Sequence, residues 1–345
     1  MSVRRAVPAV LFSLVLALTA CAPADEGDAE TDGAATDGAE TDGAATDGGG
    51  GDGQTTRLTI ATGGTGGVYF PLGGGLAQEL SENIEGVEAT AQETSASVDN
   101  MLLIGNGDAD LAFVLGDTAA DAVEGRGTDF EGSPIEACTL GILYSNYTQL
   151  VTTPDSGIES VADLSGRRVS VGAPGSGTEV IALRILEAAG IDPDADIERS
   201  QLLVDETVDG LRDGTIDAGF WSGGLPTGAL VDLASAGELA LVPTAEYTSD
   251  LADEYGPFYL ESEIPAGTYD GVDEAIPTVV VPNVLVVNTS MDEALQQQIT
   301  QVLFEQKDDL VNVHPAASEL DAATAGEVEF MDVCPGAQTY YDEAG

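Results

Sequence analysis

The sequence predicts an α/β protein of two lobes, in which each lobe is a mostly parallel sheet flanked by helices and a cleft separates the lobes. Three observations support this fold class. The part of the chain able to fold is roughly 290 residues long, near the size at which one core divides into two. A strand, a glycine-rich turn and a helix occur in this order twice. Further strands and helices alternate after each copy, so we expect one lobe from residues 57–147 and 284–345 and the other from residues 148–283.

The first 21 residues, MSVRRAVPAVLFSLVLALTAC, have the order of an export signal. Arg4 and Arg5 precede an apolar run that is too short to span a bilayer, and small residues precede Cys21. The tetrad LTAC that ends at Cys21 resembles the bacterial lipobox, whose cysteine is lipidated and becomes the new N-terminus. We therefore expect an extracytoplasmic protein held at the cell membrane by a lipid anchor on Cys21. The alternative is an ordinary secretory signal with an incidental cysteine.

Residues 22–56 form a low-complexity segment of TDGA-type repeats followed by glycine and aspartate. It contains no aromatic or large aliphatic side chain, so it cannot bury enough surface to offset the loss of chain entropy. We expect a disordered, acidic tether between the anchor and the folded part.

The charge balance is strongly acidic, with 10 Lys+Arg against 61 Asp+Glu and a net charge of −51. Nucleic acid is excluded as a partner, because phosphate binding requires clustered lysine and arginine. Such a charge is tolerable where salt screens the repulsion between carboxylates. The composition therefore predicts a salt-adapted, halophilic source.

Two cysteines besides Cys21 occur in the chain, Cys138 and Cys334. An exported protein is exposed to conditions in which disulfides form and persist. The pair is a possible disulfide, and two buried thiols are the alternative.

The internal repeat begins at Arg57 and again at Arg167. The first copy reads RLTIATGGTGGVYFPLGGGLAQELSENI and the second RRVSVGAPGSGTEVIALRILEAAGI. In the second copy we expect a helix from about residue 177 to residue 189, with Gly190 as its stop. Each copy continues to a strand that an aspartate precedes, Asp110 in the first and Asp217 in the second. Such βαβαβ units imply parallel strands with right-handed crossovers.

The glycine turns are the expected ligand site. Ligands of open α/β sheets bind beyond the carboxyl ends of the strands, where both turns lie. A glycine turn that opens a helix presents free backbone N–H groups and the positive end of the helix dipole. The turn at Gly175–Thr178 lacks the lysine of a nucleotide-binding loop, so ATP is not expected, and a small anionic group fits it instead. The alternative is that both turns serve only tight packing.

Several segments in this order resemble the TAXI family of solute receptors for tripartite ATP-independent periplasmic (TRAP) transporters: TGGTGGVYFPLGG, TSASVDNMLLIGNGDADLAFV, DLSGRRVSVGAPGSGTE, IPAGTYDG and CPGAQTYY. The resemblance covers residues 57–341. It implies a type II periplasmic-binding-protein fold that closes on a small organic anion or amino acid, such as glutamate, glutamine or a 2-oxoglutarate-like acid, and passes it to a TRAP permease. The segments crossing between the lobes are expected near residues 144–152 and 277–287.

The resemblance also implies the residues that contact the ligand. They are small or polar residues of the two turns and of the TSASVDN segment, with one aromatic residue from each lobe: Thr65, Gly66, Gly67, Val68, Tyr69, Ser95, Ser97, Asn100, Ser176, Gly177, Thr178 and Trp221. Alternatives stay open for several of them. Ser97 is equally suited to capping a helix, Asn100 to a helix surface and Trp221 to core packing. Glu179 suits the helix dipole, and Arg184 is most simply a solvated charge.

An enzymatic role is not expected. The chain has one histidine, His314, far in sequence from either glycine turn, so neither a Ser/His/Asp set nor a histidine-rich metal site is predicted. No cofactor is expected. The second function considered is a surface lipoprotein that binds another protein or serves a sensor, with no role in transport.

Overall fold

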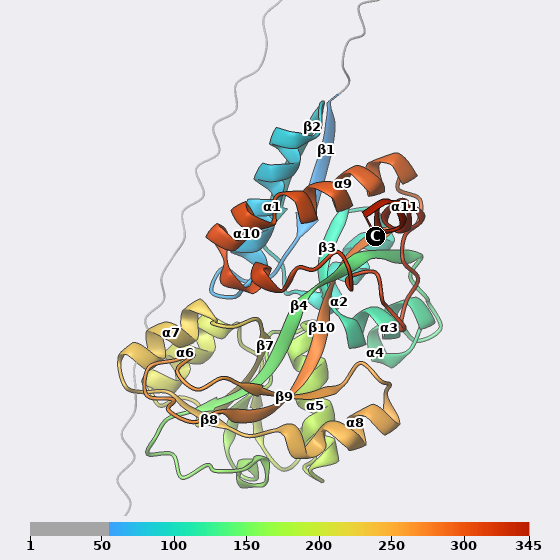
Figure 1. Ribbon diagram of the computed structural model, residues 1–345. Helices are drawn as coiled ribbons and strands as arrows, with labels where there is room; N and C mark the ends of the chain where they lie inside the picture. The colour runs from blue at the N-terminus through green and yellow to red at the C-terminus, as the bar shows by residue number, and fades with distance from the viewer. Residues whose placement is uncertain (1–54, 345) are drawn as a thin grey trace, which may run out of the picture. The chain divides into compact units, whose positions relative to one another are not determined.

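The computed structural model describes residues 55–344. The expected export signal, the anchor site Cys21 and nearly all of the expected tether lie outside these residues, so those expectations stay predictions. Figure 1 shows a sheet that runs through the described part, with helices on both of its faces.

The first half of the repeat folds as three parallel strands in the order β2-β1-β3, with two helices between them. The elements are β1 (Thr56–Ala61), α1 (Tyr69–Asn83), β2 (Val87–Gln92), α2 (Ser97–Asn106) and β3 (Leu111–Leu115). Gly73 brings α1 close to the sheet, because a Cβ atom there would lie 2.5 Å from Thr62 Cγ2 and 3.3 Å from Phe113 Cε2. The carboxyl end of β1 and the start of α1 are thereby held together.

The second half repeats this topology in the order β6-β5-β7, again with parallel strands. Its elements are β5 (Arg168–Ser170), α5 (Gly177–Ala188), β6 (Glu198–Ser200), α6 (Val204–Arg212) and β7 (Ala218–Gly223). The expected helix is confirmed, and Gly190 follows it with a φ of +72°.

The two aspartates of the repeat occupy equivalent positions. Asp110 Oδ2 accepts a hydrogen bond from Thr59 N at 2.7 Å, and Asp217 Oδ2 accepts one from Arg168 N at 2.9 Å. Each aspartate therefore ties the strand that it precedes to the first strand of its own unit.

Two long antiparallel strands, β4 (Ala137–Thr152) and β10 (Ile276–Asn288), join these units into one sheet. β10 pairs with β3 through residues 283–287 and with β9 (Leu260–Ile264) through residues 276–280. β4 pairs with β7 and with β8 (Ala240–Val242) through its last residues. We call the β1–β3 side lobe 1 and the β5–β9 side lobe 2; β4 and β10 belong to both, and the expected lobe boundaries fall inside them (Figure 1).

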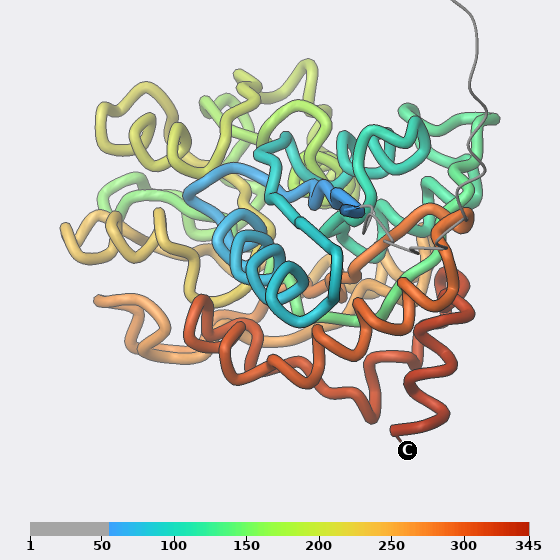
Figure 2. The backbone as a smooth tube through the Cα atoms, turned by 90° about the horizontal axis from the view of Figure 1, so that it is seen from above, coloured from blue at the N-terminus to red at the C-terminus, as the bar shows by residue number. Residues whose placement is uncertain are grey.

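The remaining helices cover the two faces of the sheet. They are α3 (Gly116–Glu124), α4 (Gly127–Phe130), α7 (Gly228–Ser235), α8 (Thr248–Glu254), α9 (Glu293–Glu305), α10 (Lys307–Val313) and α11 (Pro335–Ala344), with 3₁₀ turns η1 (Val161–Leu164), η2 (Ala245–Tyr247) and η3 (Pro315–Glu319). The chain returns to lobe 1 after β10, where α9 and α10 lie beside α1 (Figure 2). Buried apolar residues form separate clusters on each face of each lobe, as expected for α/β layers.

Cys138 of β4 and Cys334, which precedes α11, form a disulfide with a Cα–Cα distance of 5.1 Å. The backbone supports the same junction, because Cys334 N donates to Thr139 O at 2.8 Å. The bond closes a loop spanning 196 residues that includes all of lobe 2.

We expect the double substitution Cys138→Ala and Cys334→Ala to lower the free energy of unfolding by about 2–5 kcal/mol, because the bond restricts the unfolded chain. Chemical denaturation in the presence and absence of reductant measures this. Reductant should destabilise the unsubstituted protein by a similar amount and leave the double variant unchanged. A reductant effect on the variant would show that another group is responsible.

Candidate ligand-binding site

A cavity lies where the two glycine turns meet, between lobe 1 and lobe 2. Its lining comes from both lobes: Gly63, Gly64, Gly67, Val68, Tyr69, Ser95, Ala96, Ser97, Leu115, Ala173, Ser176, Gly177, Thr178, Leu203, Trp221, Ser222 and Gly223. The volume of the cavity is about 30 Å³. That is room for roughly two or three waters, so the lobes are close together in this structure.

Three helices begin at the cavity. The lining includes Val68 and Tyr69 at the start of α1, Ser97 at the start of α2, and Gly177 at the start of α5. No side chain caps α1 or α2. Helix N-termini carry partial positive charge and, at α1 and the first residues of α5, backbone N–H groups without a helical partner; the first N–H groups of α2 are largely used by Gly175 O. The cavity therefore favours an anionic group without any basic side chain.

The lobe 2 turn is shaped by two hydroxyl groups. Ser176 Oγ caps α5 by accepting from Glu179 N at 3.1 Å, and Thr178 Oγ1 accepts from Ser222 N at 3.1 Å. Both hydroxyl hydrogens remain available as donors. The carboxylate of Glu179 is held by Gly175 N at 3.0 Å and by Arg199. Glu179 therefore serves the turn and does not line the cavity.

The lobe 1 turn packs against aromatic and aliphatic side chains of lobe 2. A Cβ atom on Gly67 would lie 2.9 Å from Cη2 of Trp221, and one on Gly64 would lie 3.0 Å from Cδ2 of Leu203. The Trp221 indole Nε1 donates to Thr227 Oγ1 at 2.9 Å, which fixes the ring against the turn. A larger residue at either position would displace the opposing side chain, because lobe 2 approaches the backbone of this turn so closely.

Ala96 is the only non-glycine residue in the described part of the chain with a positive φ, at 81°. This conformation costs about 1–3 kcal/mol for a residue with a Cβ atom, and such residues concentrate at ligand sites. It turns the chain so that Val98 N and Asp99 N, at the start of α2, both reach Gly175 O of lobe 2 at 3.1 Å. A bond between Ala229 N of α7 and Gly66 O, at 3.4 Å, also joins the lobes.

Three of the expected ligand contacts do not line the cavity. Thr65 and Gly66 lie in a neighbouring surface recess, where the Asp205 carboxylate meets the backbone of Gly66. Asn100 is fully buried, and its Nδ2 donates to Thr62 O at 2.7 Å and to Phe113 O at 2.8 Å. Asn100 is thus neither a surface residue nor part of the lining, because its amide is used to hold the turn to β3.

The other expected contacts are brought together by the fold. Nine residues of the predicted set line the one cavity: Gly67, Val68, Tyr69, Ser95, Ser97, Ser176, Gly177, Thr178 and Trp221. Sequence reasoning missed several small and apolar lining residues, such as Ala96, Leu115 and Ser222. Gly63 and Gly64 sit within a motif that was recognised, but no local signal marks Leu115 or Leu203.

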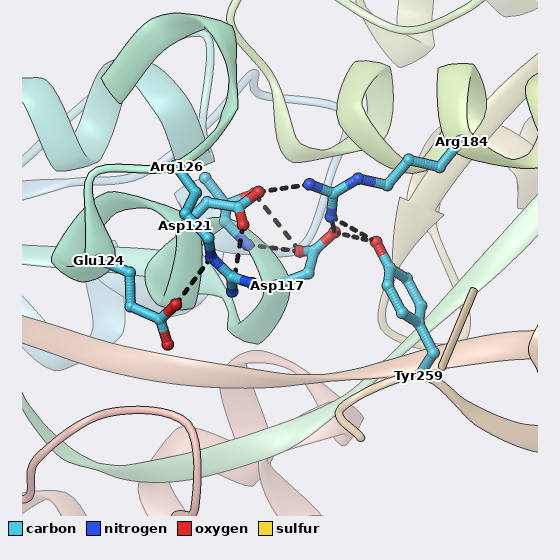
Figure 3. Close-up of polar contacts among 7 residues, drawn as sticks. Asp117, Asp121, Glu124, Arg126, Arg184 and Tyr259 are labelled. Atoms are coloured by element: carbon cyan, nitrogen blue, oxygen red, sulfur yellow. Dashed lines mark hydrogen bonds and ion pairs between the residues drawn. The ribbon is translucent and has the colours of Figure 1, made fainter. Parts of the chain in front are cut away.

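An ion-pair network beside the cavity joins α5 of lobe 2 to α3 (Figure 3). The expectation that Arg184 is solvated is wrong, since its side chain is 10% exposed and its guanidinium pairs with Asp117 and Asp121. Arg184 Nη1 also donates to the Tyr259 hydroxyl at 2.8 Å, and this hydroxyl donates to Asp117 Oδ2 at 2.7 Å. The guanidinium lies 4.1 Å from the ring centre of Tyr255. Burial raises the pKa of Asp117, while Arg184 and Tyr259 oppose the rise.

The same network extends toward the surface. Arg126, which is 42% exposed, lies 3.4 Å from Asp121 and 2.8 Å from Glu124 (Figure 3). Asp121 therefore faces two guanidinium groups, one buried and one at the edge. The network connects α5 of lobe 2 with α3 and supplies no charged group to the cavity.

His314 has a structural position. Its Nδ1 accepts from Ala316 N at 3.1 Å, so Nε2 carries the hydrogen that faces Pro226 O at 3.2 Å. Burial lowers the pKa of His314, which favours this neutral form. Within residues 55–344, no cluster of histidine, cysteine or acidic residues has the arrangement of a metal site. The same residues include no helix of the length and apolar character needed to cross a bilayer.

Solved structures of solute-binding proteins are similar over most of the chain. The alkanesulfonate-binding protein SsuA from Xanthomonas axonopodis pv. citri, bound to MOPS, is 16% identical with a TM-score of 0.48, covering 84% of both chains. The aliphatic sulphonate binding protein SsuA from Escherichia coli is 14% identical with a TM-score of 0.45, covering 83% of this chain and 78% of its own. A putative L-cystine ABC transporter protein from Listeria monocytogenes is 13% identical with a TM-score of 0.45, covering 80% and 100%.

The sequence match to a family model is the more direct comparison. The model of the NMT1-like family matches residues 60–345, from the end of β1 to the end of the chain. The match therefore includes both glycine turns, both long strands and every residue that lines the cavity. This chain belongs to the NMT1-like family.

Proposed function

We propose that this protein is the extracytoplasmic solute receptor of a TRAP transporter of the TAXI type. It captures a small organic anion or amino acid, such as glutamate, glutamine or a 2-oxoglutarate-like acid, and delivers it to a membrane permease. A lipid on Cys21 keeps it at the membrane. The observation that carries the proposal is the single cavity to which both glycine turns contribute, with helix N-termini directed at it from both lobes.

Hinge closure is the proposed mechanism. The crossing strands β4 and β10 connect the lobes, and a ligand that contacts both lobes favours the closed arrangement. The backbone bonds from Val98 and Asp99 to Gly175 O, and the ion pairs of Arg184, form part of this closed arrangement. Because the cavity has room for only a few waters, solute entry requires the lobes to separate.

A thermal-shift screen tests this function directly. The probes are amino acids and small mono- and dicarboxylates, added to the purified protein in molar salt to screen its negative charge. A true ligand at 100 times its dissociation constant raises the free energy of unfolding by about 2.7 kcal/mol. The matched control is the Gly177→Ala variant, in which closure is obstructed and the shift should disappear.

The second candidate is a surface lipoprotein that binds another protein or serves a sensor. The small volume of the cavity favours this second function. It predicts no stabilisation by any small solute. An empty screen of broad chemical range therefore favours it over the receptor.

A further inference from the structure

A strip of polar side chains crosses the middle of the sheet beneath the cavity. It consists of Tyr144, Asn146 and Thr148 on β4, Asn283 on β10 and Ser222 on β7, and we call it the polar strip. Asn283 is opposite Tyr144, and Thr148 is opposite Ser222, in the strand registers. Because alternate residues of a strand point to the same face, Asn146 lies on the same face of β4 as Tyr144 and Thr148.

The polar strip interrupts an otherwise apolar face. Farther along β10, Leu285 belongs to the core of lobe 1, whereas Val279 and Val281 belong to the core of lobe 2. The strip therefore lies where the two cores meet. Fully buried polar residues in this position require a reason, since apolar residues pack on either side.

The groups of the polar strip lack partners within the protein. Both carboxamide atoms of Asn146 and of Asn283 are buried without a hydrogen bond, as are the hydroxyls of Tyr144, Thr148 and Ser222. Apart from Thr248, the described part of the chain has no other side chain in this condition. Native proteins leave few such groups, and their concentration in one strip points to a partner that is not the protein itself.

The strip borders the cavity at several points. Leu115, which lines the cavity, is opposite Asn283, and Ser222 lines it directly. Burial raises the pKa of Tyr69, and the nearby side chains of Ser97, Asn283 and Asn146 oppose this rise. The Tyr69 hydroxyl, at the cavity, therefore lies close to both amides of the strip. The cavity therefore has helix N-termini around it and carboxamides beneath it.

The charge of the lining restricts what these amides can bind. None of the residues that line the cavity is ionised at neutral pH. The nearby carboxylates of Asp117 and Glu179 are already occupied by Arg184 and Arg199. A carboxamide both donates and accepts hydrogen bonds. The carboxamides of Asn146 and Asn283 therefore suit a neutral ligand group that also donates and accepts hydrogen bonds.

We propose that Asn146 and Asn283 bind the uncharged polar end of the solute. The solute is a small carboxylate whose charged end faces the helix N-termini and whose other end is a carboxamide or hydroxyl group. This inference rests on the receptor function proposed above and narrows its ligand. Separation of the lobes exposes the strip, and closure on the solute supplies the missing hydrogen bonds.

The substitutions Asn146→Leu and Asn283→Leu test the proposal, because leucine has a similar shape and no polar atoms. We expect each variant to bind succinamate, glutaramate or L-glutamine at least about tenfold more weakly. In the absence of ligand each variant should gain about 2–4 °C in Tm, since an unsatisfied buried amide has been removed. Asn100→Leu is the matched control: its amide is fully bonded, so its ligand-free Tm should fall.

A pair of probes separates recognition of the amide from general binding. Succinamate and 4-methylpentanoate differ in having a carboxamide or an isopropyl group at the same place. The unsubstituted protein should prefer succinamate, and the leucine variants should lose this preference. Titration calorimetry measures the affinity of each protein for each probe. Equal affinity of the unsubstituted protein for the two probes overturns the proposal.

The failure of this inference is distinguishable from failure of the receptor function. If other carboxylates stabilise the protein while no probe with an amide or hydroxyl is preferred, only the role of the polar strip is wrong. If no solute binds at all, the receptor function fails. A lower ligand-free Tm in the leucine variants shows instead that the amides stabilise the fold through bound water, which also overturns the proposal.

Discussion

The Arg184→Met variant should lose about 3–5 kcal/mol of unfolding free energy, because it leaves two buried carboxylates without their counter-charge. Asp117 is fully buried and Asp121 nearly so, and only the partly exposed Arg126 remains near Asp121. Methionine keeps most of the aliphatic volume of arginine, so the loss reports the charge. Chemical denaturation in moderate salt measures the effect.

Two further variants make the result interpretable. Arg212→Met removes an exposed pair with Glu238 from the same lobe, and it should change stability by less than about 0.5 kcal/mol. Adding Asp117→Asn to Arg184→Met should recover part of the loss, because one unpaired charge is removed. The ion-pair network does not stabilise the contact between the lobes if Arg184→Met loses less than about 1 kcal/mol of unfolding free energy, or if the double variant recovers none of it.

The Gly177→Ala variant should weaken solute binding by about 100-fold while the lobes themselves stay folded. A Cβ atom at this position would lie 2.5 Å from Leu115 Cδ1 and 2.8 Å from Ser97 Oγ, both from lobe 1. Since real Cβ atoms do not approach so closely, the methyl group holds the lobes apart. Binding that requires closure then loses affinity in proportion to the closed population.

Calorimetric titration with the solute found in the screen measures this loss. Gly74→Ala is the control, because a Cβ atom there meets nothing within 4 Å in helix α1. It should leave affinity unchanged and stability equal or slightly higher. Unchanged affinity in Gly177→Ala would show that binding does not need the contact between the turns.

The parts of the site that were predictable are those whose signal is local. The glycine turns before α1 and α5 are recognisable from short runs of consecutive residues. The repeated order of strand, turn and helix places both turns at the carboxyl ends of parallel strands. Their meeting at one cavity follows from the two-lobed arrangement. The lining by Gly67, Ser176 and Trp221 was therefore expected from the sequence.

Other features carried a weak signal that was not recognised. Asn283 interrupts the run TVVVPNVLVV, in which all the remaining residues are apolar, threonine or proline. A lone amide in the middle of a buried strand is unusual and marks a position worth testing for function. Asn146, in the mixed segment YSNYTQ, carries no such contrast with its neighbours.

By itself the sequence determined the alternating α/β elements, the paired glycine turns and the strongly acidic charge balance. These depend on residues close together in the chain, where spacing and residue type suffice. Only the tertiary structure decided which distant groups meet. Arg184 pairs with aspartates more than sixty residues away. Asn100 turns inward to bond the backbone, and Asn146 and Asn283 come together only because β4 and β10 pair, which no local pattern encodes.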